Sequence, residues 1–253
     1  MTEFERTDGG TADRTRPANH RHAATDRARQ TVDHRPSSLG SVLAVTLAAL
    51  STALVATDPL QNRSLAVVLL GVLVLGVGYR GREGALPTVR LGLGLAVVFA
   101  GIWLSISADL GRIADAELLP GLYGLTVLGL GLLPIREGWE TKLATLGVAL
   151  VLVTVLFSGI TRDAGLVPIL AATVAAVAAW DAARHAITLG EQVGRSAVEP
   201  IAELAHLGAT TGVGVATVAL AVTVWRLQIT DVPLLALVCL LGAGAALLFV
   251  VYE

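Results

Sequence analysis

Eight apolar runs separated by short polar segments occupy most of the chain. They cover roughly residues 39 to 57, 61 to 79, 90 to 107, 118 to 135, 143 to 160, 165 to 180, 208 to 225 and 232 to 252. Each run approaches the length of about 20 residues that a helix needs to cross about 30 Å of hydrocarbon. The pattern therefore predicts an all-α protein, a polytopic membrane helix bundle with about eight transmembrane helices.

Two polar segments interrupt this pattern and set the expected domain organisation. Residues 1–38 hold seven arginines, six acids and three histidines but almost no large apolar side chains, so we expect a disordered tail. Residues 181–207 carry polar side chains at steps of three and four, which is typical of an amphipathic helix. The predicted units are the tail at 1–38, a six-span bundle at 39–180, the amphipathic helix at 181–207 and a two-span hairpin at 208–253.

Composition supports membrane insertion. The chain is 54% hydrophobic with a mean hydropathy of +0.72, and only 15% of its residues are charged. Soluble domains carry about 25% charged residues, so a soluble fold of this composition could not solvate its surface. The single cysteine, Cys239, lies in the last apolar run and has no intrachain partner for a disulfide or a metal site.

The distribution of Lys and Arg predicts the orientation. The tail holds seven, the loop at 80–90 three, the loop at 136–142 two and the segment at 181–207 two. The alternate side holds one per loop, at Arg63, Arg112, Arg162 and Arg226. Because cytoplasmic flanks retain positive charge, we expect a multi-pass protein of the cell membrane with both termini in the cytoplasm.

The spans offer little chemistry. They contain no Asp, Glu, Lys or His, the groups that mark proton relays and catalytic centres in membranes, and their only Arg residues are Arg63 and Arg90, near the starts of the second and third. Their polar residues are hydroxyls, which mostly bond their own backbone or a neighbouring helix. We therefore expect no enzyme activity, no metal and no cofactor. A path lined by Ser and Thr would instead indicate a small-solute transporter or channel, which is the alternative function.

The segment at 181–207 is the candidate partner surface. Its opposite face, which includes Ala183, Ile187, Gly190, Ile201 and Leu204, is expected to pack inward, and Pro200 is expected to break the helix. The polar face consists of Asp181, Arg184, His185, Glu191, Gln192, Arg195, Glu203 and His206.

A weak internal repeat is also visible. Residues 76–92 and 131–147 share an Arg-Glu-Gly sequence and then a Leu-Gly pair that enters the next span. Both hairpins would have the same orientation, so a true repeat would be a tandem duplication. Chance similarity in such Gly- and Leu-rich sequence is the alternative.

The polar segment also carries a resemblance. Trp180-Asp181, Ala186, "LGEQVGR" from Leu189 to Arg195, and then Glu203 and His206 resemble a cytoplasmic segment of uncharacterised haloarchaeal multi-pass integral membrane proteins. Those proteins commonly have an acidic residue where this chain has Arg184. The resemblance implies no assigned activity, but it implies a setting near a MoxR-type ATPase and proteins with von Willebrand-like domains.

These observations together favour a non-enzymatic structural or partner-docking membrane component. Its environment is the lipid bilayer, its candidate partner by resemblance belongs to a MoxR-type ATPase system, and no nucleic acid partner is expected.

Overall fold

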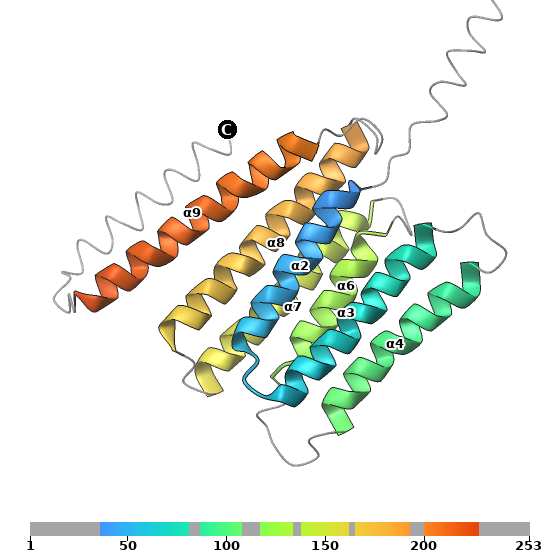
Figure 1. Cartoon of the computed structure of the whole chain (residues 1–253), viewed down its shortest axis with the longest axis horizontal. Coiled ribbons are helices and arrows are strands. Elements are labelled where there is room, and N and C mark those ends of the chain that lie inside the picture. Colours follow the sequence, from blue (N-terminus) through green and yellow to red (C-terminus); the bar gives the residue numbers. More distant parts are fainter. Residues whose placement is uncertain are drawn as a thin grey trace, which may run out of the picture.

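The described part of the chain is entirely helical. The structure is a computed structural model that describes residues 36–80, 87–107, 117–133, 138–161, 165–192 and 200–227. Within these ranges the helices are α2 (Ser38–Val55), α3 (Pro59–Arg80), α4 (Pro87–Ser107), α6 (Leu119–Gly131), α7 (Glu140–Thr161), α8 (Leu166–Gln192) and α9 (Pro200–Arg226) (Figure 1). Six of them are long and apolar enough to cross a membrane, whereas α6 has only 13 residues. The predicted polytopic helix bundle is confirmed.

The first seven predicted spans each correspond to one of these helices. The eighth predicted span at 232–252 and residues 1–35 of the predicted tail lie outside the described residues. The end of the sixth span differs from the prediction, because α8 continues past residue 180 to Gln192. The reason is local: residues 181–189 contain neither Gly nor Pro, so nothing stops the helix. The residues predicted as a separate helix at 181–207 therefore belong partly to α8 and partly to α9.

Prolines mark where helices begin. Pro59, Pro87 and Pro200 are the first residues of α3, α4 and α9, positions where the missing N–H leaves no bond unmade. The start of α3 adds a capping box, in which the Asp58 carboxylate accepts from the Leu60 N–H at 2.8 Å. The Gln61 side chain reaches back and accepts from the N–H of the N-cap Asp58 at 3.4 Å and from the Thr57 N–H at 3.1 Å.

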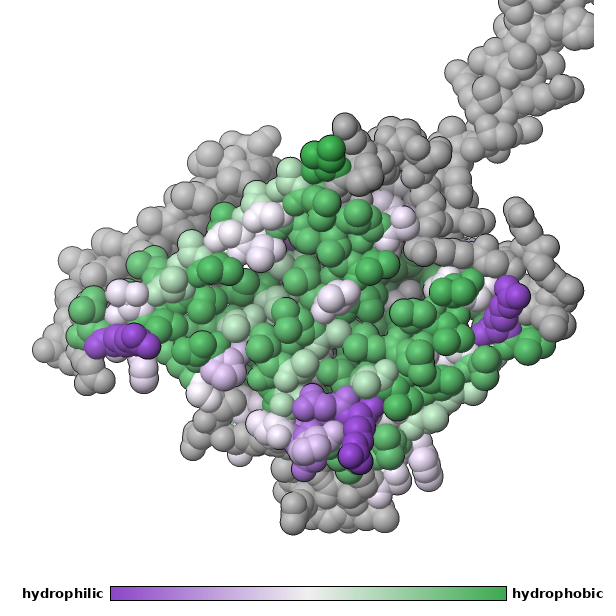
Figure 2. Space-filling model, in the orientation of Figure 1, coloured by the Kyte–Doolittle hydropathy of each residue, from purple (hydrophilic) through white to green (hydrophobic). Residues whose placement is uncertain are grey.

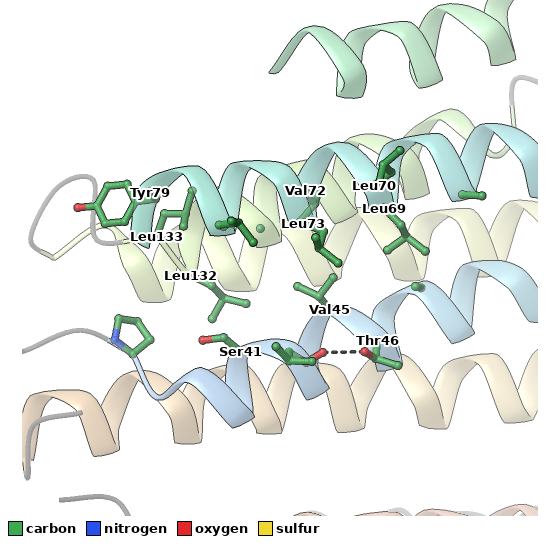
Figure 3. A pocket seen from close by; sticks show the side chains of 17 residues that line it. Ser41, Val45, Thr46, Leu69, Leu70, Val72, Leu73, Tyr79, Leu132 and Leu133 are labelled. Atoms are coloured by element: carbon green, nitrogen blue, oxygen red, sulfur yellow. Dashed lines mark hydrogen bonds between the residues drawn. The ribbon is translucent and has the colours of Figure 1, made fainter. Parts of the chain in front are cut away.

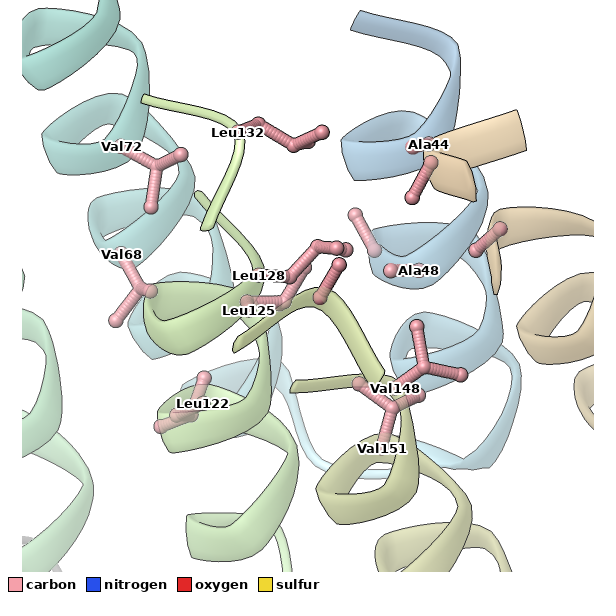
Figure 4. Close-up of a cluster of buried hydrophobic side chains, with 14 of the residues drawn as sticks. Ala44, Ala48, Val68, Val72, Leu122, Leu125, Leu128, Leu132, Val148 and Val151 are labelled. Carbon is pink, nitrogen blue, oxygen red and sulfur yellow. The ribbon is translucent and has the colours of Figure 1, made fainter. Parts of the chain in front are cut away.

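The core is centred on α6. This helix contacts α2, α3, α4 and α7, and its Leu122, Leu125 and Leu128 are fully buried. Figure 4 shows these leucines among smaller side chains from three neighbouring helices, which are Ala44, Ala48, Val68, Val72, Val148 and Val151. The hairpin of α3 and α4 lies on one side of this centre, and α8 followed by α9 lies on the other (Figure 1).

The outer surface is broadly apolar. Phe99, Trp103 and Ile160 are 61%, 69% and 79% exposed, and Figure 2 shows hydrophobic side chains across the visible face with hydrophilic ones at its margins. In water such a surface would favour association, whereas in lipid it costs nothing. The chain is therefore a multi-pass integral membrane protein.

Glycines bring α3 and α4 into backbone contact. A Cβ added to Gly71 would lie 2.6 Å from the backbone nitrogen of Val98, and one added to Gly94 would lie 2.8 Å from the backbone nitrogen of Leu75. No side chain fits between helices at these distances. The two helices thus pack along their length through the close approach that glycine permits in membranes.

The hairpin of α6 and α7 repeats this packing. A Cβ on Gly124 would lie 2.9 Å from the backbone nitrogen of Val151, and one on Gly147 would lie 2.5 Å from the backbone nitrogen of Leu128. Each contact recurs 53 positions after its counterpart in α3 and α4, as residue numbers 71 and 124 or 94 and 147 show.

The same shift aligns the two sequences. Identical pairs at this spacing are Leu65 and Leu118, Leu69 and Leu122, Gly71 and Gly124, Val74 and Val127, Leu75 and Leu128, Gly76 and Gly129, Gly78 and Gly131, Thr88 and Thr141, Leu93 and Leu146, Gly94 and Gly147, Ala96 and Ala149, Val98 and Val151, and Ser105 and Ser158. The two hairpins are a tandem repeat. The Arg-Glu-Gly similarity lies one residue out of this register, so the repeat is carried by the glycines that pack the helices and not by the loops.

Candidate functional site

A carboxylate joins α8 to α9. The Asp181 Oδ2 atom on α8 accepts a hydrogen bond from the Thr210 hydroxyl at 2.7 Å and lies 3.0 Å from the His206 Nε2 atom, both on α9. Because an ionised carboxylate only accepts, the His206 ring donates from Nε2. One aspartate thus holds two side chains of the neighbouring helix.

Helical spacing explains why these groups meet. His206 and Thr210 are four residues apart, so both point from the same face of α9. Asp181 and His185 are likewise four apart on α8, and the His185 and His206 rings stack with centroids 4.2 Å apart and an interplanar angle of 14°. We call Asp181, His185, His206 and Thr210 the Asp181 cluster.

The aromatic side chain beside the cluster ties α8 to α7. The Trp180 Nε1 atom donates to the Thr145 hydroxyl at 3.3 Å. The Arg184 guanidinium lies over the Trp180 ring, 5.0 Å from its centroid, as a cation–π pair. Arg184 stays exposed in this position, so its charge remains available to the surroundings.

The beginning of α2 also reaches this region. The Ser37 backbone N–H donates to the Ala186 carbonyl of α8 at 3.0 Å, and the Ser37 hydroxyl accepts from the Gly40 N–H at 3.2 Å, which caps α2. A very small hollow between α2, α8 and α9 is lined by Gly40, Leu43, Ala182, His185, His206 and Leu207. One end of the bundle is therefore tied together across α2, α7, α8 and α9.

The order of groups in the Asp181 cluster is that of a structural contact between helices and not that of a catalytic triad. In a serine or threonine hydrolase the imidazole stands between the hydroxyl and the carboxylate, so that it can take the hydroxyl proton. Here the carboxylate stands between the hydroxyl and the imidazole. The Thr210 proton is directed at the Asp181 carboxylate, and no imidazole contacts the Thr210 hydroxyl in the described contacts. Within the described residues no group of three His, Cys, Asp or Glu side chains is placed to hold a metal ion.

The structure brings together part of the predicted surface. Asp181, Arg184, His185 and His206 meet around the cluster. Glu191 is exposed near the end of α8. Gln192 ends α8 and Glu203 lies in α9; their side chains and all of Arg195 lie outside the described residues.

The predicted inward face is confirmed only on α8. Ala183 and Ile187 are buried at 0% and 4% exposure, and Gly190 is buried with them. Ile201 and Leu204 were expected on the same face, but they are 73% and 51% exposed. The prediction assumed one continuous helical phase, whereas these residues belong to α9, a separate helix that begins at Pro200 and does not continue the phase of α8.

Sequence reasoning did not find the partners that complete the site. Thr210 could have been predicted as a member of the site, because it follows His206 by one helical turn. Thr145 had none, since it is 35 residues from Trp180 in the sequence. The expected self-bonding of span hydroxyls is confirmed for Thr126, Thr173, Thr217 and Thr223, each of which donates to a carbonyl of its own helix. Buried Thr154 and Ser158 have no hydrogen-bond partner among the described residues.

Comparison with known proteins places the chain in a family. It belongs to a family of unknown function, DUF7519, whose family model matches residues 106–248. This stretch covers more than half of the chain, from the end of α4 to beyond α9, and includes the whole Asp181 cluster. No curated protein and no solved structure matches the chain. The protein is thus an integral membrane protein of a family without an assigned activity.

Proposed function

We propose that the protein is a non-enzymatic component of the cell membrane that binds a partner protein at its cytoplasmic face, around the junction of α8 and α9. The observation that carries this proposal is the gathering of polar side chains there, at one end of an apolar helix bundle. Asp181, His185 and His206 hold the junction in shape. Arg184 and Glu191 stay exposed beside it, one positive and one negative. A rigid surface with two exposed charges suits the recognition of a partner with complementary charges.

The hydrogen bonds around this junction and in the spans favour binding over catalysis or transport. The Thr210 hydroxyl donates directly to a carboxylate, without the intervening imidazole of a hydrolase triad. In the spans, Thr126, Thr173 and Thr217 are already bonded to their own helices. The donors of these three hydroxyls are therefore engaged, which supports a docking role, whereas a small-solute path would have to use the unpartnered hydroxyls of Thr154 and Ser158.

The orientation of the protein is part of the proposal. With both termini in the cytoplasm, a reporter fused after Glu253 should report the cytoplasm, and cysteines placed at Arg112 or Arg162 in a Cys239→Ala background should react with an impermeant reagent from outside. The reason is the excess of Lys and Arg on the alternate loops. Labelling of a cysteine placed after Glu253 from outside would contradict the proposed topology.

The role of the docking surface can be tested separately from that of the Asp181 cluster that supports it. We expect the double variant Arg184→Ala with Glu191→Gln to keep the parent melting temperature in detergent, because exposed charges contribute about 0 to 1 kcal/mol. We also expect it to lose the partner that the parent retains after crosslinking in native membranes and purification at high salt. The matched control is Lys142→Ala with Glu140→Gln at the start of α7, which changes the same kinds of charge outside the surface.

The control pair should retain the partner. The resemblance described above makes a MoxR-type ATPase the first partner to test, by binding of the purified ATPase to the reconstituted protein. Equal retention of the partner by both double variants would show that this surface does not dock it.

A further inference from the structure

A groove separates two helices that are neighbours in the chain. Helices α2 and α3 are joined by residues 56–58 only, yet they contact each other little. Helix α2 packs mainly against α8, and the glycines of α3 bring it against α4, so α2 and α3 diverge from their short connection. Between them lies a half-open cavity of about 530 Å³ (Figure 3).

The walls of the groove are hydrocarbon. Val45 of α2, Leu69 and Leu73 of α3, and Leu132 and Leu133, which directly follow α6, point toward the space in Figure 3. Because α6 closes the back, the space is a groove bounded by three helices and not an ordinary lipid-facing surface. None of the described residues that line it is charged.

The few hydroxyls on the α2 wall are already satisfied. The Ser41 hydroxyl donates to the Ser37 carbonyl at 2.6 Å, and the Thr46 hydroxyl donates to the Val42 carbonyl at 2.8 Å. The backbone of the walls is helical and makes its own hydrogen bonds. A polar solute would therefore lose its hydration in the groove without new partners, whereas a hydrocarbon chain would lose nothing.

The size of the groove also selects its occupant. Along α3 it runs from Ala66 to Tyr79, which is about 20 Å of helix. A helix from another protein is about 10 Å across and would have to enter the space between α2 and α3 as a rigid rod. A hydrocarbon chain is thinner and flexible, so a single chain can follow the half-open cavity of about 530 Å³ along this length.

We propose that the groove between α2, α3 and α6 binds one hydrocarbon chain of a membrane lipid. The hydrocarbon chain enters from the leaflet in which Ser41 and Tyr79 lie. This end of the groove is the one farthest from the connection between α2 and α3. This proposal depends on the membrane placement of the helices and not on the docking surface at α8 and α9, so either can fail without the other.

Photolabelling tests the proposal. The protein is reconstituted in vesicles that contain a phospholipid with a diazirine in its acyl chain, and labelled peptides are located by mass spectrometry. We expect saturable labelling around Val45 and Leu73 that clearly exceeds labelling around Phe99 and Trp103, which are lipid-facing on α4. A parallel arm with a diazirine fatty acid distinguishes a phospholipid chain from a free fatty acid as the source of the chain.

Filling the groove should abolish the preferred labelling. Gly76 lines the groove, and a Cβ added there meets no atom within 4 Å. Gly76→Leu combined with Ala66→Leu should lower groove labelling by about tenfold, the factor expected when roughly two buried methylene groups of the ligand are displaced. Gly92→Leu is the matched control, because Gly92 also has open space around its Cβ but lies on α4 outside the groove.

Thermal unfolding of each variant in detergent checks that it is folded, and Ala66→Leu alone replaces the double variant if that one is not. Labelling that is equal on the groove and on α4, or that survives filling of the groove, would overturn the proposal. So would a photoreactive amino acid at Leu73 that forms its adduct with a protein segment in place of lipid.

Discussion

Replacing Gly147 by leucine should prevent the protein from accumulating in membranes in a folded form. A Cβ at this position would lie 2.5 Å from the backbone nitrogen of Leu128 and 2.7 Å from the backbone oxygen of Gly124. Backbone atoms of a packed helix cannot rotate away as a side chain can, so α6 and α7 would have to separate. Overpacking costs about 1 to 3 kcal/mol where side chains can adjust, and we expect at least the upper value here.

Quantification of folded protein by size-exclusion chromatography after membrane extraction measures this effect. Because about 1.4 kcal/mol corresponds to a tenfold change in an equilibrium, we expect a loss of at least about a hundredfold in the ratio of folded to unfolded protein. Gly92→Leu is the control, since it adds the same side chain where no atom lies within 4 Å. Equal yields from the two variants would contradict the glycine-mediated contact of α6 with α7.

Replacing Asp181 by alanine should loosen α9 from the bundle. The change removes the acceptor of both the Thr210 hydroxyl and the His206 ring. A hydrogen bond contributes about 0.5 to 1.5 kcal/mol net, so two would contribute about 1 to 3 kcal/mol. The Asp181 side chain is 33% exposed, so water replaces part of the loss and we expect a destabilisation of about 1 to 2 kcal/mol.

Two measurements check this prediction. The melting temperature in detergent should fall for Asp181→Ala and stay unchanged for Glu191→Ala, which removes an exposed carboxylate from the same helix. Spin labels at Val177 of α8 and Leu220 of α9, in a Cys239→Ala background, should show a broader distance distribution in Asp181→Ala.

A double-mutant cycle identifies the cause. If Thr210 stabilises the protein through Asp181, the effects of Thr210→Val and Asp181→Ala will not add, because residues that share a bond couple. Strictly additive effects on the free energy of unfolding would show that the two side chains act separately. The contact between α8 and α9 would then not depend on their hydrogen bond.

The fold class could be predicted because membrane insertion is a property of local sequence. Runs such as 143–160 are long and apolar enough to enter lipid whichever helix they later contact. Helix beginnings are equally local, since Pro120 and Pro168 lie in the first turns of α6 and α8, where the missing N–H leaves no bond unmade. The end of α8 was not predicted correctly. The prediction stopped the helix where polarity rises at Asp181, although a rise in polarity does not itself end a helix.

The repeat also has one part that is visible in the sequence and one part that only the structure shows. Gly71, Gly94, Gly124 and Gly147 are visible in the sequence, but nothing in their local context distinguishes them from Gly92, which faces open space. Their common role emerged only when the contacts of both hairpins were compared. The loop similarity that first suggested a repeat placed it one residue out of register.

The sequence by itself determined that this chain is a bundle of membrane helices, that its apolar runs carry hydroxyls and no charged residues except Arg63 and Arg90, and that a polar segment interrupts these runs between Trp180 and His206. These properties follow from composition and from spacing within single helices, which each segment has before it meets another. The tertiary structure decided that Asp181 meets His206 and Thr210, that Ile201 and Leu204 face outward, and that α2 and α3 diverge around a groove. Such features depend on how helices rotate and pack against one another, and close packing through small residues sets those rotations only when the neighbouring helices are present.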